Sequence, residues 1–91
     1  MVVTVVTWEL SIPGSDSLKR KRSVLRSIKD RLRKLNVSVV ESGRQDSRNQ
    51  AEISVAFLAA HHAQADSILE SVDRTVSMGD ALVVRTHRER Y

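Results

Sequence analysis

The hydrophobic pattern of this chain switches between two periods, twice and in the same order, and this limits the folds open to it. Residues 2–12 alternate with a period of two, so their even-numbered side chains should face a core. Pro13 and Gly14 end this strand. Apolar side chains then recur at helical spacing to about residue 35, after three candidate N-cap residues: Ser15, Asp16 and Ser17.

The rest of the chain repeats this strand–helix order with two extra strands, one before it and one after it. We predict a strand, a hairpin loop, a strand, a helix and a short last strand at residues 37–42, 43–50, 51–59, 63–78 and 81–86. Asn36 and Gly79 stand at the C-termini of the two predicted helices. The charged end of the chain, residues 86–91, is expected to fray.

The order strand–helix–strand–strand–helix–strand is that of the ferredoxin-like split βαβ motif. Two right-handed crossovers would place both helices on one face of a four-stranded antiparallel sheet. We therefore expect an α+β ferredoxin-like sandwich forming a single domain over residues 1–91. The other sheet face has no cover, and it is a predicted homo-oligomer interface, most simply a dimer, through four apolar residues: Val3, Val5, Ala56 and Leu58.

Composition narrows the chemistry. The chain has 91 residues and no cysteine, so disulfides, a thiolate nucleophile and thiolate metal sites are excluded. A chain this short buries a modest core, so a partner subunit would help it. No run of eighteen apolar residues occurs, and Glu9 interrupts the N-terminal apolar stretch, which argues against a signal peptide. We expect a cytoplasmic protein that does not enter a membrane.

The chain is basic, and its cations are clustered. Fifteen Lys and Arg against eleven Asp and Glu leave a net charge of +4. Four consecutive cations open the first helix, where the helix dipole disfavours each by about 0.3–1 kcal/mol. Such a cost favours a functional role, and phosphate contact with RNA is the obvious one. The predicted nucleic-acid-binding residues are Lys19, Arg20, Lys21, Arg22, Arg26, Lys29, Arg33, Arg44 and Arg48.

Both parts of this cluster have a plainer interpretation. The helix cations could form a solvated face paired with an acid such as Asp30. In the hairpin loop, Gln45, Asp46 and Asn49 are predicted to position a partner, because loops carry many binding residues. Equally, Asp46 and Asn49 could only bond the local backbone of a flexible turn.

Two motifs in the chain resemble the YlxP-like family of small bacterial proteins of unknown function. The first motif comprises Ile12, Pro13, Gly14, Ser17, Leu18, Lys19, Lys21 and Arg22. The second comprises Gln45, Asp46, Ala51 and Glu52. The resemblance implies a ferredoxin-like fold, and it implies RNA or ribosome association because family genes often neighbour translation and ribosome-maturation genes. It brings no catalytic activity and no cofactor.

The chain departs from the pattern of this family at two positions. Asp16 stands where a histidine is usual, and Arg48 stands where a tryptophan is usual in the hairpin loop. If that tryptophan contacts a partner, Arg48 changes the contact from stacking to charge.

Other chemistries find little support. Trp8 and Phe57 lie on the strands that carry base-stacking aromatics in an RNA-recognition motif, but their parity places them in the core. His61 and His62 are adjacent and have only Asp66 nearby, so no metal site is predicted. No nucleophile elbow, P-loop or dinucleotide motif occurs. We expect no enzyme and no cofactor.

Two functions stay open. The chain is predicted to be a non-catalytic RNA- or ribosome-associated binding module. The alternative is a homo-oligomeric protein-interaction or regulatory module that uses the uncovered sheet face.

Overall fold

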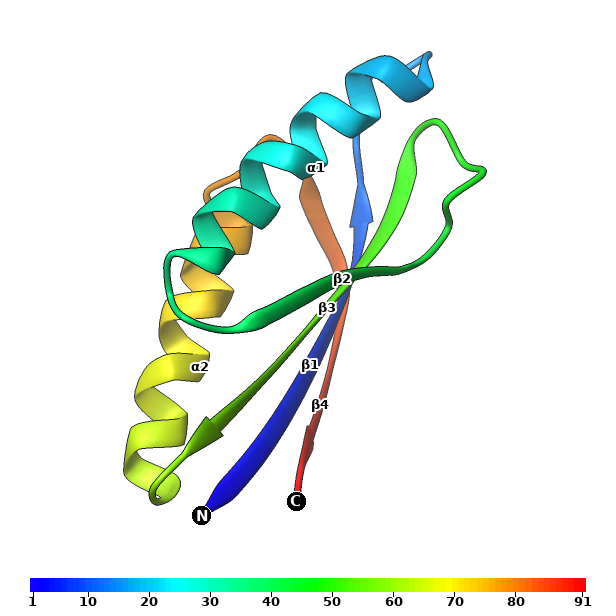
Figure 1. Ribbon diagram of the computed structural model, residues 1–91. Helices are drawn as coiled ribbons and strands as arrows, with labels where there is room; N and C mark the ends of the chain where they lie inside the picture. Colours follow the sequence, from blue (N-terminus) through cyan, green and yellow to red (C-terminus); the bar gives the residue numbers. More distant parts are fainter.

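The computed structural model describes residues 1–91 as a four-stranded antiparallel sheet with both helices on one face (Figure 1). Within the sheet the strand order is β2-β3-β1-β4. This arrangement confirms the ferredoxin-like α+β fold predicted from the sequence. The elements are β1 (Val2–Ser11), α1 (Leu18–Arg33), β2 (Ser38–Gly43), β3 (Gln50–Ala59), α2 (His62–Ser77) and β4 (Leu82–Arg90).

The core lies between the sheet and the helices, and strand alternation builds it. Every even-numbered residue of β1 is buried, and every odd-numbered one is partly exposed. Trp8 and Phe57 lie among the 18 buried apolar residues, as their parity predicts. The Nε1–H of Trp8 donates to Asp73 Oδ1 of α2 at 3.0 Å, which satisfies the buried indole.

The residues that cap the two helices differ in their hydrogen bonds and backbone conformation. Ser17 is the N-cap of α1, and its hydroxyl accepts from the Arg20 N–H at 3.2 Å. Asn36 follows α1 with a φ of 60°, the left-handed conformation expected of it. Gly79 has no positive φ after α2. A Cβ at this glycine would lie 2.8 Å from a side-chain carbon of Ile28, so close packing of the helices requires Gly79.

The prediction that residues 86–91 fray is wrong. These residues continue β4 as far as Arg90, and β4 pairs with β1 along its length. Arg88 reaches Asp73 at 2.8 Å, and Arg90 reaches Asp66 at 2.9 Å, both on α2. These ion pairs and the backbone hydrogen bonds to β1 order residues 86–90, although their charged sequence is not typical of a strand.

Neither helix is both long enough and apolar enough to span a membrane.

Candidate polyanion-binding groove

A groove runs between α1 and β2, the strand at one edge of the sheet. Two adjoining hollows of about 380 and 190 Å³ form it, and Leu25 of α1 and Glu41 of β2 line both. We call this depression the α1–β2 groove. Four cationic side chains of α1 line its larger hollow: Arg22, Arg26, Lys29 and Arg33.

Helical spacing aligns these four cations. Positions 22, 26, 29 and 33 follow the i, i+4, i+7, i+11 pattern, which places them on one stripe of the helix about 16 Å long. This stripe lies beside the apolar stripe that packs on the sheet, so the cations border the core without entering it. The spacing of the cations in the sequence therefore predicts their common position.

Most of these cations have no acidic partner within the chain. Arg33 pairs with Asp30 at 3.2 Å, one turn away on the same helix. Arg22, Arg26 and Lys29 form no ion pair with any carboxylate of the chain. The carboxylate of Glu41 on the opposite wall already lies 3.7 Å from Lys21. The groove thus presents unpaired positive charge.

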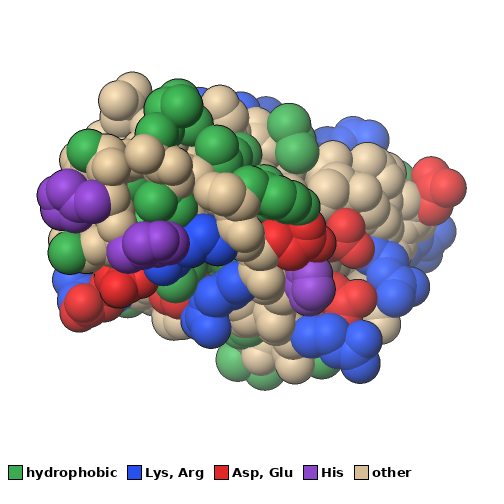
Figure 2. Space-filling model, turned by 90° about the horizontal axis from the view of Figure 1, so that it is seen from below, with side chains coloured by type: hydrophobic (Ala, Val, Ile, Leu, Met, Phe, Trp, Pro, Cys, Tyr) green, Lys and Arg blue, Asp and Glu red, His purple; other side chains and the backbone are tan.

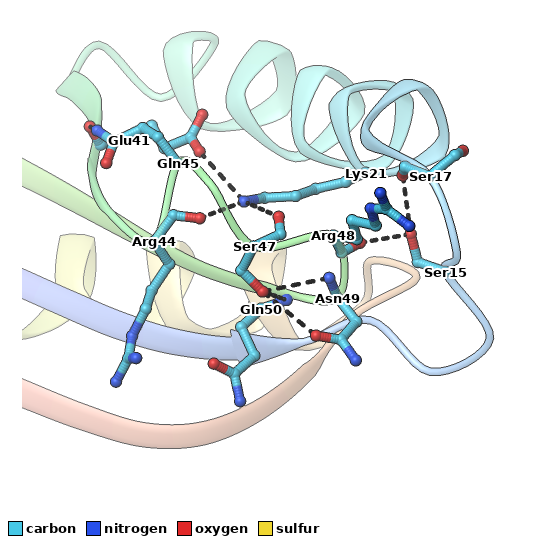
Figure 3. A network of polar contacts seen from close by, with 10 residues as sticks. All are labelled: Ser15, Ser17, Lys21, Glu41, Arg44, Gln45, Ser47, Arg48, Asn49 and Gln50. Carbon is cyan, nitrogen blue, oxygen red and sulfur yellow. Dashed lines mark hydrogen bonds and ion pairs between the residues drawn. The ribbon is translucent and has the colours of Figure 1, made fainter.

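Lys21 does not belong to this exposed set, and the prediction that it contacts phosphate is wrong. Its side chain is only 2% exposed. The ammonium donates to the backbone carbonyls of Arg44 at 2.5 Å and Ser47 at 2.7 Å (Figure 3). The signal was in the spacing: residue 21 lies three positions after Leu18 and four before Leu25, which places Lys21 on the apolar stripe.

The hairpin loop between β2 and β3 is tied to the turn before α1, although a flexible turn was one expectation. The Ile12 N–H donates to the Asn49 carbonyl at 2.8 Å, and the Ser15 hydroxyl donates to the Arg48 carbonyl at 2.7 Å. With the two bonds from Lys21, four hydrogen bonds join the segments that carry the two sequence motifs; Figure 3 shows those of Ser15 and Lys21. These motifs therefore form one structural unit.

The loop side chains do not converge on the groove, apart from Gln45, which lines the smaller hollow. Arg44 points away from α1 (Figure 3) and lines a separate hollow of about 160 Å³. Asp46 and Arg48 are exposed and form no ion pair. Asn49 contacts the Ser47 hydroxyl at 3.2 Å through its Oδ1.

Two predicted cations at the start of α1, Lys19 and Arg20, are exposed and line neither hollow. Lys19 lies three positions before Arg22 and continues the groove stripe by one turn. By helical spacing, Arg20 projects well away from the groove stripe, as do Arg31 and Lys34. Of the predicted binding residues, four lie together along the larger hollow: Arg22, Arg26, Lys29 and Arg33.

Two of the three histidines take structural positions at the start of α2, and the third, His87, lies on β4 beside Glu89. His61 is the N-cap, and its ring Nδ1 accepts from the Gln64 N–H at 3.2 Å. The guanidinium of Arg90 contacts both His62 and Asp66. No three His, Asp or Glu side chains gather where a metal ion could bind.

The fold and the groove together define a small ferredoxin-like α+β protein with a basic groove along its first helix. The chain belongs to the family described as Protein of unknown function (DUF503), whose model matches residues 3–88. No curated protein matches the sequence.

Solved structures share the fold at low identity. The de novo designed protein Ferredog-Diesel has a TM-score of 0.56 and 14% identity, covering 96% of this chain and 83% of its own. TA0507, a candidate chlorite dismutase, has a TM-score of 0.54 and 14% identity, over 99% of this chain and 43% of its own. SnoaB, a cofactor-independent oxygenase from Streptomyces nogalater, has a TM-score of 0.50 and 11% identity, over 99% and 90%. Such identities show the fold alone, because one fold hosts many functions.

Proposed function

We propose that this protein is a non-catalytic, cytoplasmic RNA-binding module that associates with ribosomal particles through the α1–β2 groove. One observation carries the proposal: Arg22, Arg26 and Lys29 line one wall of the same groove with no acidic partner in the chain. Unpaired cations gain from phosphate contact because they displace counterions condensed on the nucleic acid. The motifs that resemble the YlxP-like family support the ribosomal association.

The shape of the groove favours a single RNA strand. A single row of cations about 16 Å long can follow one phosphate backbone, whereas a duplex presents two. The opposite wall is β2, whose outer edge has no strand partner. Unpaired backbone groups on such an edge can bond to the sugar and base edges of an extended strand. We do not propose base-specific recognition.

A matched pair of triple variants tests the groove. The groove variant carries Arg22→Gln, Arg26→Gln and Lys29→Gln. The control variant removes the same charge from other sides of α1 through Arg20→Gln, Arg31→Gln and Lys34→Gln. Fluorescence anisotropy would measure the affinity of each protein for a single-stranded ribosomal RNA fragment, and for its duplex, over a salt series.

The wild type should bind the single strand more tightly than the duplex, and binding should weaken as salt rises. Each single-strand phosphate contact contributes about −0.7 to the slope of log affinity against log salt, so the groove variant should flatten this slope by about 2. The control variant should keep the wild-type slope. Salt-insensitive binding, no binding at low salt, or equal losses in both variants would contradict the groove; tighter duplex binding would contradict the single-strand part.

Association with ribosomal particles needs a separate experiment. Tagged wild-type protein should recover ribosomal RNA from a bacterial lysate, and nuclease treatment should abolish the recovery. The groove variant should recover little, and the control variant should match the wild type. Recovery that survives nuclease would indicate a protein partner instead and would contradict the proposal.

A further inference from the structure

The sheet face opposite the helices has a ladder of apolar contacts at one end. Val3 lies between Leu58 of β3 and Tyr91, which exchanges two backbone hydrogen bonds with it. Val5 faces Ala56 in the next row. Leu58 is 61% exposed and Tyr91 is 69% exposed. Half of the exposed large apolar side chains of the molecule lie on this open face by register: Val40, Leu58, Leu82 and Tyr91.

The polar side chains on the open face are largely satisfied among themselves. Thr7 and Ser54 share a hydrogen bond of 2.7 Å, and Ser54 donates to Ser42 at 2.8 Å. Ser42 in turn donates to Glu52 at 2.9 Å. A relay of this kind can be covered by another surface without leaving hydroxyl groups unpaired. The middle of the face, around Thr7, Ser54 and Ser42, is therefore suited to burial.

The other end of the open face carries charge of both signs in one row. Arg85 of β4 lies 3.7 Å from Glu9 of β1, and Glu9 lies directly opposite Glu52 of β3. This row holds one cation and two carboxylates across three neighbouring strands. A surface that lays a second cation on the row would relieve the repulsion between the carboxylates.

We propose that the open face binds the open face of a second copy of this chain, about a two-fold axis parallel to the strands. This axis brings the apolar end onto the apolar end of the partner. It also reverses the strand order, so β4 of each copy lies over β2 of the other, and Arg85 approaches Glu52 on the adjacent β3. An axis across the strands would set Arg85 over Glu89, but it would lay the carboxylates of Glu9 and Glu52 over the apolar Val5 and Ala56.

The area of the open face is large enough for a specific dimer interface. The strands have ten, ten, nine and six residues, and each residue covers about 16 Å² at a rise of about 3.4 Å and a strand spacing of about 4.8 Å. Two such faces cover roughly 1,100 Å², which clears the roughly 1,000 Å² expected of a biological interface. The inference is independent of RNA binding, which uses the other side of the sheet.

The first test is the concentration dependence of the mass, measured by light scattering and sedimentation equilibrium on protein freed of nucleic acid. The wild type should be dimeric at high concentration. Leu58→Arg should weaken the dimer at least tenfold, because it places a charge in the apolar end. Met78→Arg is the matched control at another exposed apolar residue, away from the sheet, and it should dimerise like the wild type.

The second test reverses the charges of the row formed by Arg85, Glu9 and Glu52. A variant with Arg85→Glu carries only acids in the row, and a variant with Glu9→Arg and Glu52→Arg carries only cations. Each should be monomeric alone, and an equimolar mixture should dimerise, an outcome that a change within one copy does not produce. A wild type that stays monomeric at high concentration would overturn the inference. So would a dimer unaffected by Leu58→Arg, or a mixture of folded variants that stays monomeric.

Discussion

The cations of α1 and those of β4 are of the same residue types but differ in what they contact. All three arginines of β4 pair with acids of neighbouring elements: Arg85 with Glu9, Arg88 with Asp73 and Arg90 with Asp66. On α1, by contrast, Arg22, Arg26 and Lys29 have no acidic partner. The end of the molecule seen in Figure 2 shows basic, acidic and histidine side chains interspersed, as such pairing requires.

This difference shows that the number of charges on an element does not determine their role. The arginines of β4 anchor a strand because α2 and β1 place carboxylates within reach of them. Arg22, Arg26 and Lys29 of α1 face a groove whose carboxylates are already engaged by Lys21 and Arg33. The excess positive charge of the chain therefore lies along α1. Four experiments test this difference between the paired arginines of β4 and the unpaired cations of α1.

The largest effect is expected at Lys21, the one cation of α1 that the fold uses internally. Lys21→Met keeps the length and the apolar stem but leaves two partly buried carbonyls of the loop and Glu41 without their cation. We expect the free energy of unfolding to fall by about 3 kcal/mol, measured by urea denaturation. The control is Arg22→Met, at the next and exposed position, which should change stability by less than about 0.5 kcal/mol. Equal effects at the two positions would contradict the contrast.

The next effect is expected at Asp73, which serves two partners from α2. Asp73→Ala removes the acceptor of the buried Trp8 Nε1–H and the partner of Arg88. We expect a loss of about 2 kcal/mol in the free energy of unfolding and a shift in tryptophan fluorescence. Asp73→Asn keeps an acceptor for Trp8 and should lose less. An unchanged stability in Asp73→Ala would show that α2 does not anchor β4.

A smaller effect separates one paired arginine from one unpaired arginine. Arg88→Gln should lower the free energy of unfolding by up to about 1 kcal/mol at low salt, and less at high salt, because its ion pair is partly exposed. Arg26→Gln should leave stability unchanged and weaken RNA binding instead. Urea denaturation at two salt concentrations, with anisotropy titrations of the same proteins, measures both quantities. The reverse pattern would contradict the division of roles.

The smallest effect is a titration at the end of β4. Tyr91 donates a hydrogen bond to Glu89, which raises the pKa of the phenol above 10.0. The same bond, with a further contact from His87, lowers the pKa of Glu89 below 4.5. The stabilisation should therefore be lost as pH rises through the raised pKa of Tyr91, or falls through the lowered pKa of Glu89.

Absorbance of the tyrosinate measures this titration directly, since Tyr91 is the only tyrosine. Glu89→Gln should return the pKa of Tyr91 toward 10.0. A wild-type phenol that titrates at its ordinary value would show that this contact is absent in solution.

Periodicity was enough to predict the elements, because alternation and helical spacing report which face of each element is buried. It also placed the α1 cations on one stripe, and the same spacing would have assigned Lys21 to the core. It could not predict that β4 extends to Arg90, because the partners of Arg88 and Arg90 lie on another element. Nor could periodicity predict that Arg44 lies away from the groove, because Arg44 itself has a left-handed backbone conformation, with a φ of 62°.

Because of the strand order, the sheet cannot be completed until the last strand has been synthesised. β1 lies in the interior of the sheet, and one of its two neighbours, β4, is the last element in chain order. At about 5–20 residues per second, ribosomal synthesis leaves one edge of β1 without a partner for roughly several seconds. Pairing with β4 closes this edge, and the ion pairs of Arg88 and Arg90 with α2 hold β4 in place. A truncated or stalled chain would expose β1, an apolar strand prone to pair with other nascent copies.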